Sequence, residues 1–193
     1  MSSATRPIAN LRSATGIPTG RLGVWWVVAS EIVIFGGILA SYVMFRLAHD
    51  AWTVQAANTN TTIGAINTFV LLTSSLFAVL GHANAVDGNG KRAAFFLRLT
   101  ALGGAIFIAI KSYEWYTEIS HGFTITSNTF WSFYYTAAGL HALHVIAGAI
   151  IMLFVARKAA KNIDLHHVEL IGIYWHFVDI VWIFLFPLLY IAK

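Results

Sequence analysis

The chain contains no cysteine. Disulfide bonds, thiolate zinc sites, cysteine-held iron–sulfur clusters and the covalent attachment of c-type haem are therefore all excluded. Cysteine usage consequently gives no indication of the redox state of the compartment. The sequence also has no internal repeat and no low-complexity tract, so a solenoid or a fibrous protein is not indicated.

Charged residues are scarce, at 10% of 193 residues, whereas 58% of the residues are hydrophobic and 15% are aromatic. This composition lies outside the range of soluble domains and is typical of a polytopic membrane protein. Five apolar runs are long enough to cross a hydrocarbon core of ~30 Å at a rise of ~1.5 Å per residue. They cover about 23–45, 63–81, 97–116, 130–155 and 168–191. The sequence thus predicts an all-α fold, with five transmembrane helices forming one domain over residues 22–193.

Residues 1–21 precede the first apolar run and contain no apolar core of their own. We expect a flexible cytoplasmic tail and not a cleaved signal peptide. Nine of the 12 Lys and Arg residues fall on the same side of the predicted helices: Arg6, Arg12, Arg21, Lys91, Arg92, Arg98, Arg157, Lys158 and Lys161. The positive-inside rule then predicts a cytoplasmic N-terminus and a C-terminus on the opposite, periplasmic side. This asymmetry explains the basic charge without a nucleic-acid partner.

Several ionisable residues lie inside the predicted spans, where a charge is costly and commonly functional. They are Glu31, Glu114, His141, His144, His176 and Asp179. His141 and His144, like His176 and Asp179, are three residues apart and should share a helix face. Matched depths suggest a polar ladder across the bundle that brings His176 and Asp179 beside His144.

Three functions are compatible with such a ladder. The side chains could form hydrogen bonds between helices, which contribute ~0.6–2 kcal/mol each. They could relay protons, or they could hold a haem or a metal. Ligation is the weakest of the three, because His-x-x-His and His-x-x-Asp do not reproduce the paired Glu-x-x-His of di-iron bundles. Ligation of a metal or haem is therefore the least favoured of the three functions.

Glu31 has no basic residue within one turn of its own helix. Burial without a partner would favour the neutral acid. It could then be a packing residue that hydrogen-bonds to a neighbouring helix, or a proton-accepting carboxylate near an entry route.

Two long motifs indicate a family. The two long motifs are Gly139-Leu140-His141-Ala142-Leu143-His144-Val145 and Tyr174-Trp175-His176-Phe177-Val178-Asp179-Ile180-Val181-Trp182. A shorter motif, Tyr113-Glu114-Trp115, precedes them. Ser30-Glu31 and Ile66-Asn67-Thr68 fit the same pattern. From about Leu22 onward the chain resembles subunit III of the haem-copper terminal oxidases, in the five-helix form common in bacteria.

This resemblance implies a non-catalytic subunit of a respiratory, proton-translocating oxidase in the bacterial cytoplasmic membrane, with cytochrome c as the expected electron donor. Its expected roles are to stabilise subunit I, to bind phospholipid and to support proton uptake while oxygen is reduced to water. The resemblance also implies no catalytic residue, metal or redox cofactor in this chain. Haem and copper are expected in the partner subunits I and II, and a small subunit IV is a further candidate partner. A quinol oxidase subunit III and a haem-bearing electron-transfer subunit are the alternatives.

The resemblance also assigns roles to individual residues. Glu31 matches an intramembrane carboxylate beside a lipid cleft. Arg157 matches a residue that contacts a lipid head group, and a guanidinium suits a phosphate. His166 and His167 resemble a histidine pair that follows it, although their spacing from Arg157 is one residue shorter.

Overall fold

The computed structural model of the chain describes residues 18–48 and 52–192, and this part is entirely helical apart from its connections. The helices are α1 (Thr19–Ala48), α2 (Trp52–Ala56), α3 (Thr61–Val86), α4 (Gly90–Ser120), α5 (Thr129–Ala159) and α6 (His166–Phe186), followed by a π-helical turn, η2 (Pro187–Ile191). Five helical segments of the described chain are long and apolar enough to cross a membrane. The predicted all-α class and the five spans are confirmed.

The helices are longer than the apolar runs that predicted them, because polar caps set their ends. Asn60 Oδ1 accepts hydrogen bonds from the backbone of Thr62 and Ile63 at the start of α3. Asn89 Oδ1 accepts from Arg92 N, so α4 begins at Gly90, about two turns before the predicted start. Of the predicted tail, residues 1–17 lie outside the described residues, while α1 already begins at Thr19.

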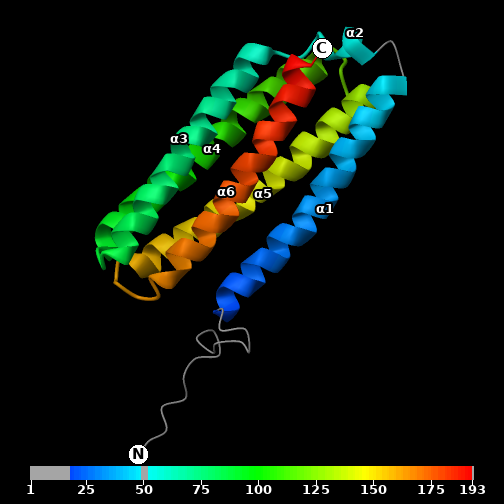
Figure 1. Cartoon of the computed structure of the whole chain (residues 1–193). Coiled ribbons are helices and arrows are strands. Elements are labelled where there is room, and N and C mark those ends of the chain that lie inside the picture. The colour runs from blue at the N-terminus through cyan, green and yellow to red at the C-terminus, as the bar shows by residue number, and fades with distance from the viewer. Residues whose placement is uncertain (1–17, 49–51, 193) are drawn as a thin grey trace, which may run out of the picture.

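The helices α3, α4, α5 and α6 pack against one another, and α1 lies at the edge of this group along α5 and α6 (Figure 1). The buried residues of α1 are Val28, Phe35 and Tyr42, one in every seven. This spacing gives a single narrow seam, as in a coiled coil. The Tyr42 hydroxyl donates to Leu188 O at 2.7 Å and so ties the far end of the seam to η2.

The core of the bundle forms around Trp175 of α6, which is fully buried. Its indole nitrogen donates to Ser74 Oγ of α3 at 3.1 Å. A Cβ atom added at Gly104 or Gly148 would meet the Trp175 ring at 2.7 or 3.1 Å. Glycine at these two positions leaves room for the Trp175 ring against α4 and α5.

The predicted last helix is interrupted near its end. Pro187 has no N–H group to continue the α-helical ladder, and the chain changes there to the wider π-helical turn. The turn closes with Ala192 N donating to Pro187 O at 2.8 Å. The start of α1 and the C-terminal end lie at opposite ends of the bundle (Figure 1). Which end faces the cytoplasm stays a prediction from the positive-inside rule.

Candidate functional site

Glu31 of α1 and His144 of α5 form a pair between helices. His144 Nε2 lies 3.1 Å from Glu31 Oε2, and the side chains are 18% and 17% exposed. The two atoms are at ion-pair distance without the alignment of a hydrogen bond. The Phe35 ring meets the imidazole edge-on at 5.4 Å between centroids. The basic partner that the α1 sequence lacks is therefore supplied by another helix.

The hydrogen bonds of His144 limit where its protons can be. Nδ1 lies 2.8 Å from Leu140 O, and because a carbonyl oxygen can only accept, this nitrogen carries a proton. Nε2 is thus the nitrogen left to face Glu31 Oε2, at 3.1 Å. The pair brings together two groups that can each bind or release a proton.

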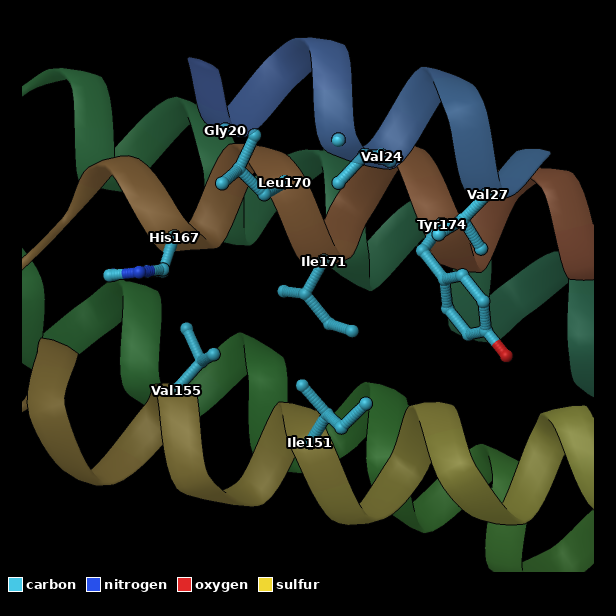
Figure 2. A pocket seen from close by; sticks show the side chains of 10 residues that line it. Gly20, Val24, Val27, Ile151, Val155, His167, Leu170, Ile171 and Tyr174 are labelled. Carbon is cyan, nitrogen blue, oxygen red and sulfur yellow. The ribbon is translucent and has the colours of Figure 1, made fainter. Parts of the chain in front are cut away.

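An apolar cavity of about 390 Å³ lies between α1, α5 and α6 (Figure 2). It is lined by Gly20, Gly23, Val24, Val27, Ile151, Val155, His167, Leu170, Ile171 and Tyr174. Tyr174 marks the deep end, where its hydroxyl donates to His144 O at 3.3 Å. His167 lies near the start of α6 at the other end. The cavity therefore extends from the helix ends to Tyr174, which connects it to the backbone of His144.

The mouth of the cavity carries charged groups. Arg21 and Glu169 form an ion pair at 2.6 Å between α1 and α6. Arg157 is exposed, two residues beyond the lining residue Val155, with its guanidinium 5.5 Å from the Phe154 ring centre. The structure thus places Arg157 and His167, both predicted to meet a lipid head group, at the same end of the bundle.

His166 and His167 lie beside Asp164 in the α5–α6 connection. A hydrogen bond from Lys158 Nζ, 3.2 Å long, lowers the pKa of the Asp164 carboxyl below its usual value. Asp164 is thus ionised at neutral pH, and a negative charge lies next to the two imidazoles.

The other predicted intramembrane residues do not form one ladder with His144. His176 contacts Ser75 of α3, with Nδ1 at 2.6 Å from Oγ, and so does not pair with His144 as expected. His141 stacks on Trp182 at 5.1 Å, and neither of its nitrogens has a hydrogen-bond partner among the described residues. Residues three apart on a helix differ by about 60° in direction, which suffices to turn His144 toward α1 and His141 into the core.

Asp179 is 4% exposed, and its carboxylate oxygens likewise have no hydrogen-bond partner in the described part of the chain. It lies one turn from His176 on α6. The prediction that Asp179 faces the interior is confirmed, whereas its expected place beside His144 finds no support in the contacts.

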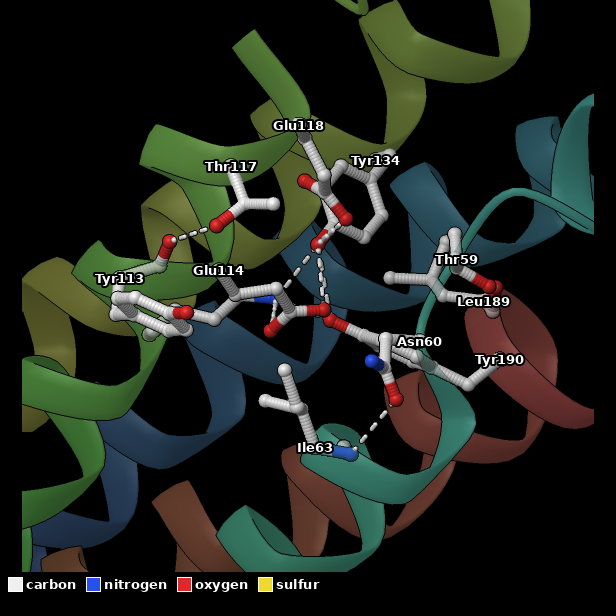
Figure 3. A network of polar contacts seen from close by, with 12 residues as sticks. Thr59, Asn60, Ile63, Tyr113, Glu114, Thr117, Glu118, Tyr134, Leu189 and Tyr190 are labelled. Carbon is white, nitrogen blue, oxygen red and sulfur yellow. Dashed lines mark hydrogen bonds and ion pairs between the residues drawn. The ribbon is translucent and has the colours of Figure 1, made fainter. Parts of the chain in front are cut away.

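A second polar cluster lies near the C-terminal end of the bundle (Figure 3). Lys111 is 1% exposed, and its ammonium donates to Glu114 Oε2 at 3.0 Å, to the Tyr134 hydroxyl at 2.8 Å and to the Tyr190 hydroxyl. The Tyr134 hydroxyl lies 3.0 Å from Glu118 Oε1. Of these residues only Glu114 was predicted. The signal was Lys111 and Glu114 at a spacing of three, which places both on one helix face.

The comparison with known proteins decides the family. Residues 12–193 match the model of the family described as cytochrome c oxidase subunit III. The chain belongs to the cytochrome c oxidase subunit III family. The resemblance carried by the motifs around Glu114, His144 and His176 is therefore confirmed, and the chain is a component of a haem-copper terminal oxidase.

Relatives in several organisms match over most of their length. Cytochrome c oxidase subunit 3 of Thermostichus vulcanus is 34% identical over 177 residues, covering 88% of this chain and 86% of the relative. Cytochrome c oxidase subunit 3 of Bacillus subtilis is 32% identical, covering 88% of this chain and 84% of the relative.

A fused relative also matches this subunit III chain. The haem-copper oxidase subunit I+III of Aeropyrum pernix is 30% identical over 188 residues, which is 89% of this chain and 22% of that protein. The name of that relative describes subunits I and III as a single polypeptide.

Proposed function

We propose that this chain is the non-catalytic subunit III of a respiratory cytochrome c oxidase, where it stabilises subunit I, binds phospholipid and supports proton uptake. The observation that carries the proposal is the Glu31–His144 contact of 3.1 Å, whose histidine is joined through its backbone carbonyl to Tyr174 in the wall of an apolar cavity. A membrane-facing acid with a histidine partner suits proton exchange, and the adjoining cavity suits a hydrocarbon chain.

The proposal assigns haem and copper to the partner subunits I and II and no redox centre to this chain. A haem with two histidine ligands would need two imidazoles facing each other across a gap. The imidazoles of His141, His144 and His176 instead face an indole, a carboxylate and a hydroxyl, respectively. These different partners support the assignment of haem to the partner subunits.

Phospholipid binding is supported by the order of groups along the cavity. The walls are apolar over about two turns of α1 and α6 and one turn of α5, and each CH₂ group buried there would contribute ~0.8 kcal/mol. Arg157 is exposed at the same end of the bundle, and its planar guanidinium can form paired hydrogen bonds with a phosphate. His166 and His167 are further candidates for the head group, and His167 lines the cavity itself.

Proton support is the role proposed for the Glu31–His144 pair. Both side chains are partly exposed, so the pair lies within reach of the bundle surface. Proton transfer between the two side chains would cross a contact of 3.1 Å. Because each uptake or release changes the net charge of the pair by one, the pair can pass on a proton only as another proton replaces it.

Phospholipid that copurifies with the oxidase complex tests the lipid role. We expect Arg157→Gln to reduce anionic phospholipid per complex several-fold by quantitative mass spectrometry, because the phosphate loses its guanidinium partner. Lys161→Gln, which removes an exposed positive charge close by, is the matched control and should retain the lipid. Equal lipid content in both variants contradicts the assignment to Arg157.

The same preparations test the lack of a redox centre. A complex stripped of this chain should keep its full haem spectrum and copper content per subunit I. A haem absorption band that remains in the purified, isolated chain would overturn this part of the proposal.

A further inference from the structure

Three metal-binding side chains meet outside the membrane-spanning helices. Asp164, His166 and His167 each offer one ligand atom, and these atoms lie within 4.8 Å of one another. The side chains of Asp164 and His167 are 41% and 35% exposed, so water and solutes can reach them. The cluster lies in the connection from α5 to α6, away from the Glu31–His144 pair.

The two imidazole rings converge in an unusual way for sequence neighbours. Consecutive residues on a helix point about 100° apart and do not face each other. His166 and His167 nevertheless lie with ring centroids 4.1 Å apart and planes inclined by 34°. Asp164 reaches the same place because the chain turns sharply just before α6, where Asp164 O accepts from His167 N at 3.0 Å.

The backbone before the cluster is held in a strained form. Asn162 and Asp164 have φ values of 55° and 54°, in the left-handed region that residues other than glycine rarely adopt. Asn162 Oδ1 accepts a hydrogen bond from Gly90 N at 2.9 Å, which fixes the connection to the start of α4. Strained backbone of this kind persists where contacts impose it and is frequent at functional sites. The three ligand groups are thus presented by an anchored turn.

We propose that Asp164, His166 and His167 form a binding site for a divalent transition-metal ion of the zinc type. Two imidazoles and one carboxylate are the donors that such ions select, and three protein ligands leave one position for water. At bond lengths of about 2.0–2.2 Å, ligand atoms of a tetrahedral site lie about 3.4 Å apart. Rotation of the exposed side chains closes the present spacing without a change in the backbone.

Lys158 competes with the metal. Its ammonium lies 3.2 Å from Asp164 Oδ2, with the Lys158 side chain 57% exposed. An exposed ion pair of this kind contributes only ~0.2–1 kcal/mol, so a dication can displace it. The Asp164 carboxylate also makes the cluster a poorer site for a phosphate than for a cation. The metal site therefore does not depend on the proposed lipid role, for which Arg157 is the principal residue.

Equilibrium dialysis of radioactive Zn²⁺ against the purified, tag-free oxidase complex tests the site. We expect His166→Gln with His167→Gln to remove one zinc equivalent, and Asp164→Asn to weaken binding while keeping a residue that tolerates the left-handed backbone. Lys158→Gln should tighten binding at least roughly twofold, because the competing ammonium is gone. His121→Gln, which removes an exposed histidine after α4, is the control and should leave zinc binding unchanged.

Unchanged zinc binding in the double histidine variant overturns the proposal, as does weaker binding in Lys158→Gln. Unaltered subunit composition and haem content in each variant establish that the complex is intact. Arg157→Gln separates this site from the lipid site, since it should lower phospholipid content and leave zinc binding as it is.

Discussion

Lys111 places a positive charge within the bundle, where lipid cannot solvate it. The ammonium is satisfied by Glu114 and by the hydroxyls of Tyr134 and Tyr190, and it also lies 4.6 Å from the centre of the Tyr134 ring. These contacts join α4, α5 and the C-terminal turn η2. Lys111 thus connects three helical segments at the end of the bundle where the last span changes from an α-helix to a π-helical turn.

Replacing Lys111 with Met should destabilise this end strongly. The carboxyl groups of Glu114 and Glu118 would lose their buried cation, and breaking a buried ion pair costs about 3–5 kcal/mol. We expect lower resistance of the chain to unfolding in detergent and less of it in the purified complex. Glu114→Gln added to Lys111→Met should restore part of the loss, and Lys91→Met, on the exposed start of α4, should cost little. A fully stable single variant would show that the network is dispensable.

The helices themselves were predictable, but their ends and their rotation were not. Hydropathy located all five spans, because a lipid-crossing helix must be apolar over its whole length. It ended the third span at residue 116, whereas α4 continues to Ser120. The burial of Lys111 inside the bundle was consequently not predicted. The short helix α2 and the π-helical turn after Pro187 gave no periodic signal in the sequence.

Packing of the Trp175 ring against α4 depends on Gly104, and replacement of this glycine tests the packing. A methyl group at Gly104 would lie 2.7 Å from the Trp175 ring, which is buried and cannot move aside. We expect Gly104→Ala to destabilise the chain by about 1–3 kcal/mol in thermal unfolding of the complex. Gly172→Ala is the matched control, because a Cβ atom there meets nothing within 4 Å. Equal stability of the two variants would contradict the packing described for Trp175.

At the scale of the whole molecule, the sequence identified the family and the individual polar residues but not their partners. Glu31 and His144 were each predicted as intramembrane residues. Their pairing depends on how α1 and α5 are rotated about their axes, which a single sequence does not determine. Asp164 was not predicted as a site residue, because a left-handed turn in the backbone brings it to the two histidines. The chain functions as one component of an oxidase, so the consequence of the Glu31–His144 pair has to be measured in the complex.

The most direct measurement is turnover and proton pumping of the oxidase carrying Glu31→Gln, reconstituted in phospholipid vesicles. The Gln amide can donate to His144 Nε2 and keep the contact, while the carboxyl group that can bind or release a proton is lost. Assembly should therefore be normal, and sustained turnover or the proton yield per electron should fall several-fold. Glu169→Gln, at the mouth of the same cavity, should leave both at the level of the unmodified enzyme. Unchanged turnover and proton yield in Glu31→Gln would show that Glu31 serves only in packing.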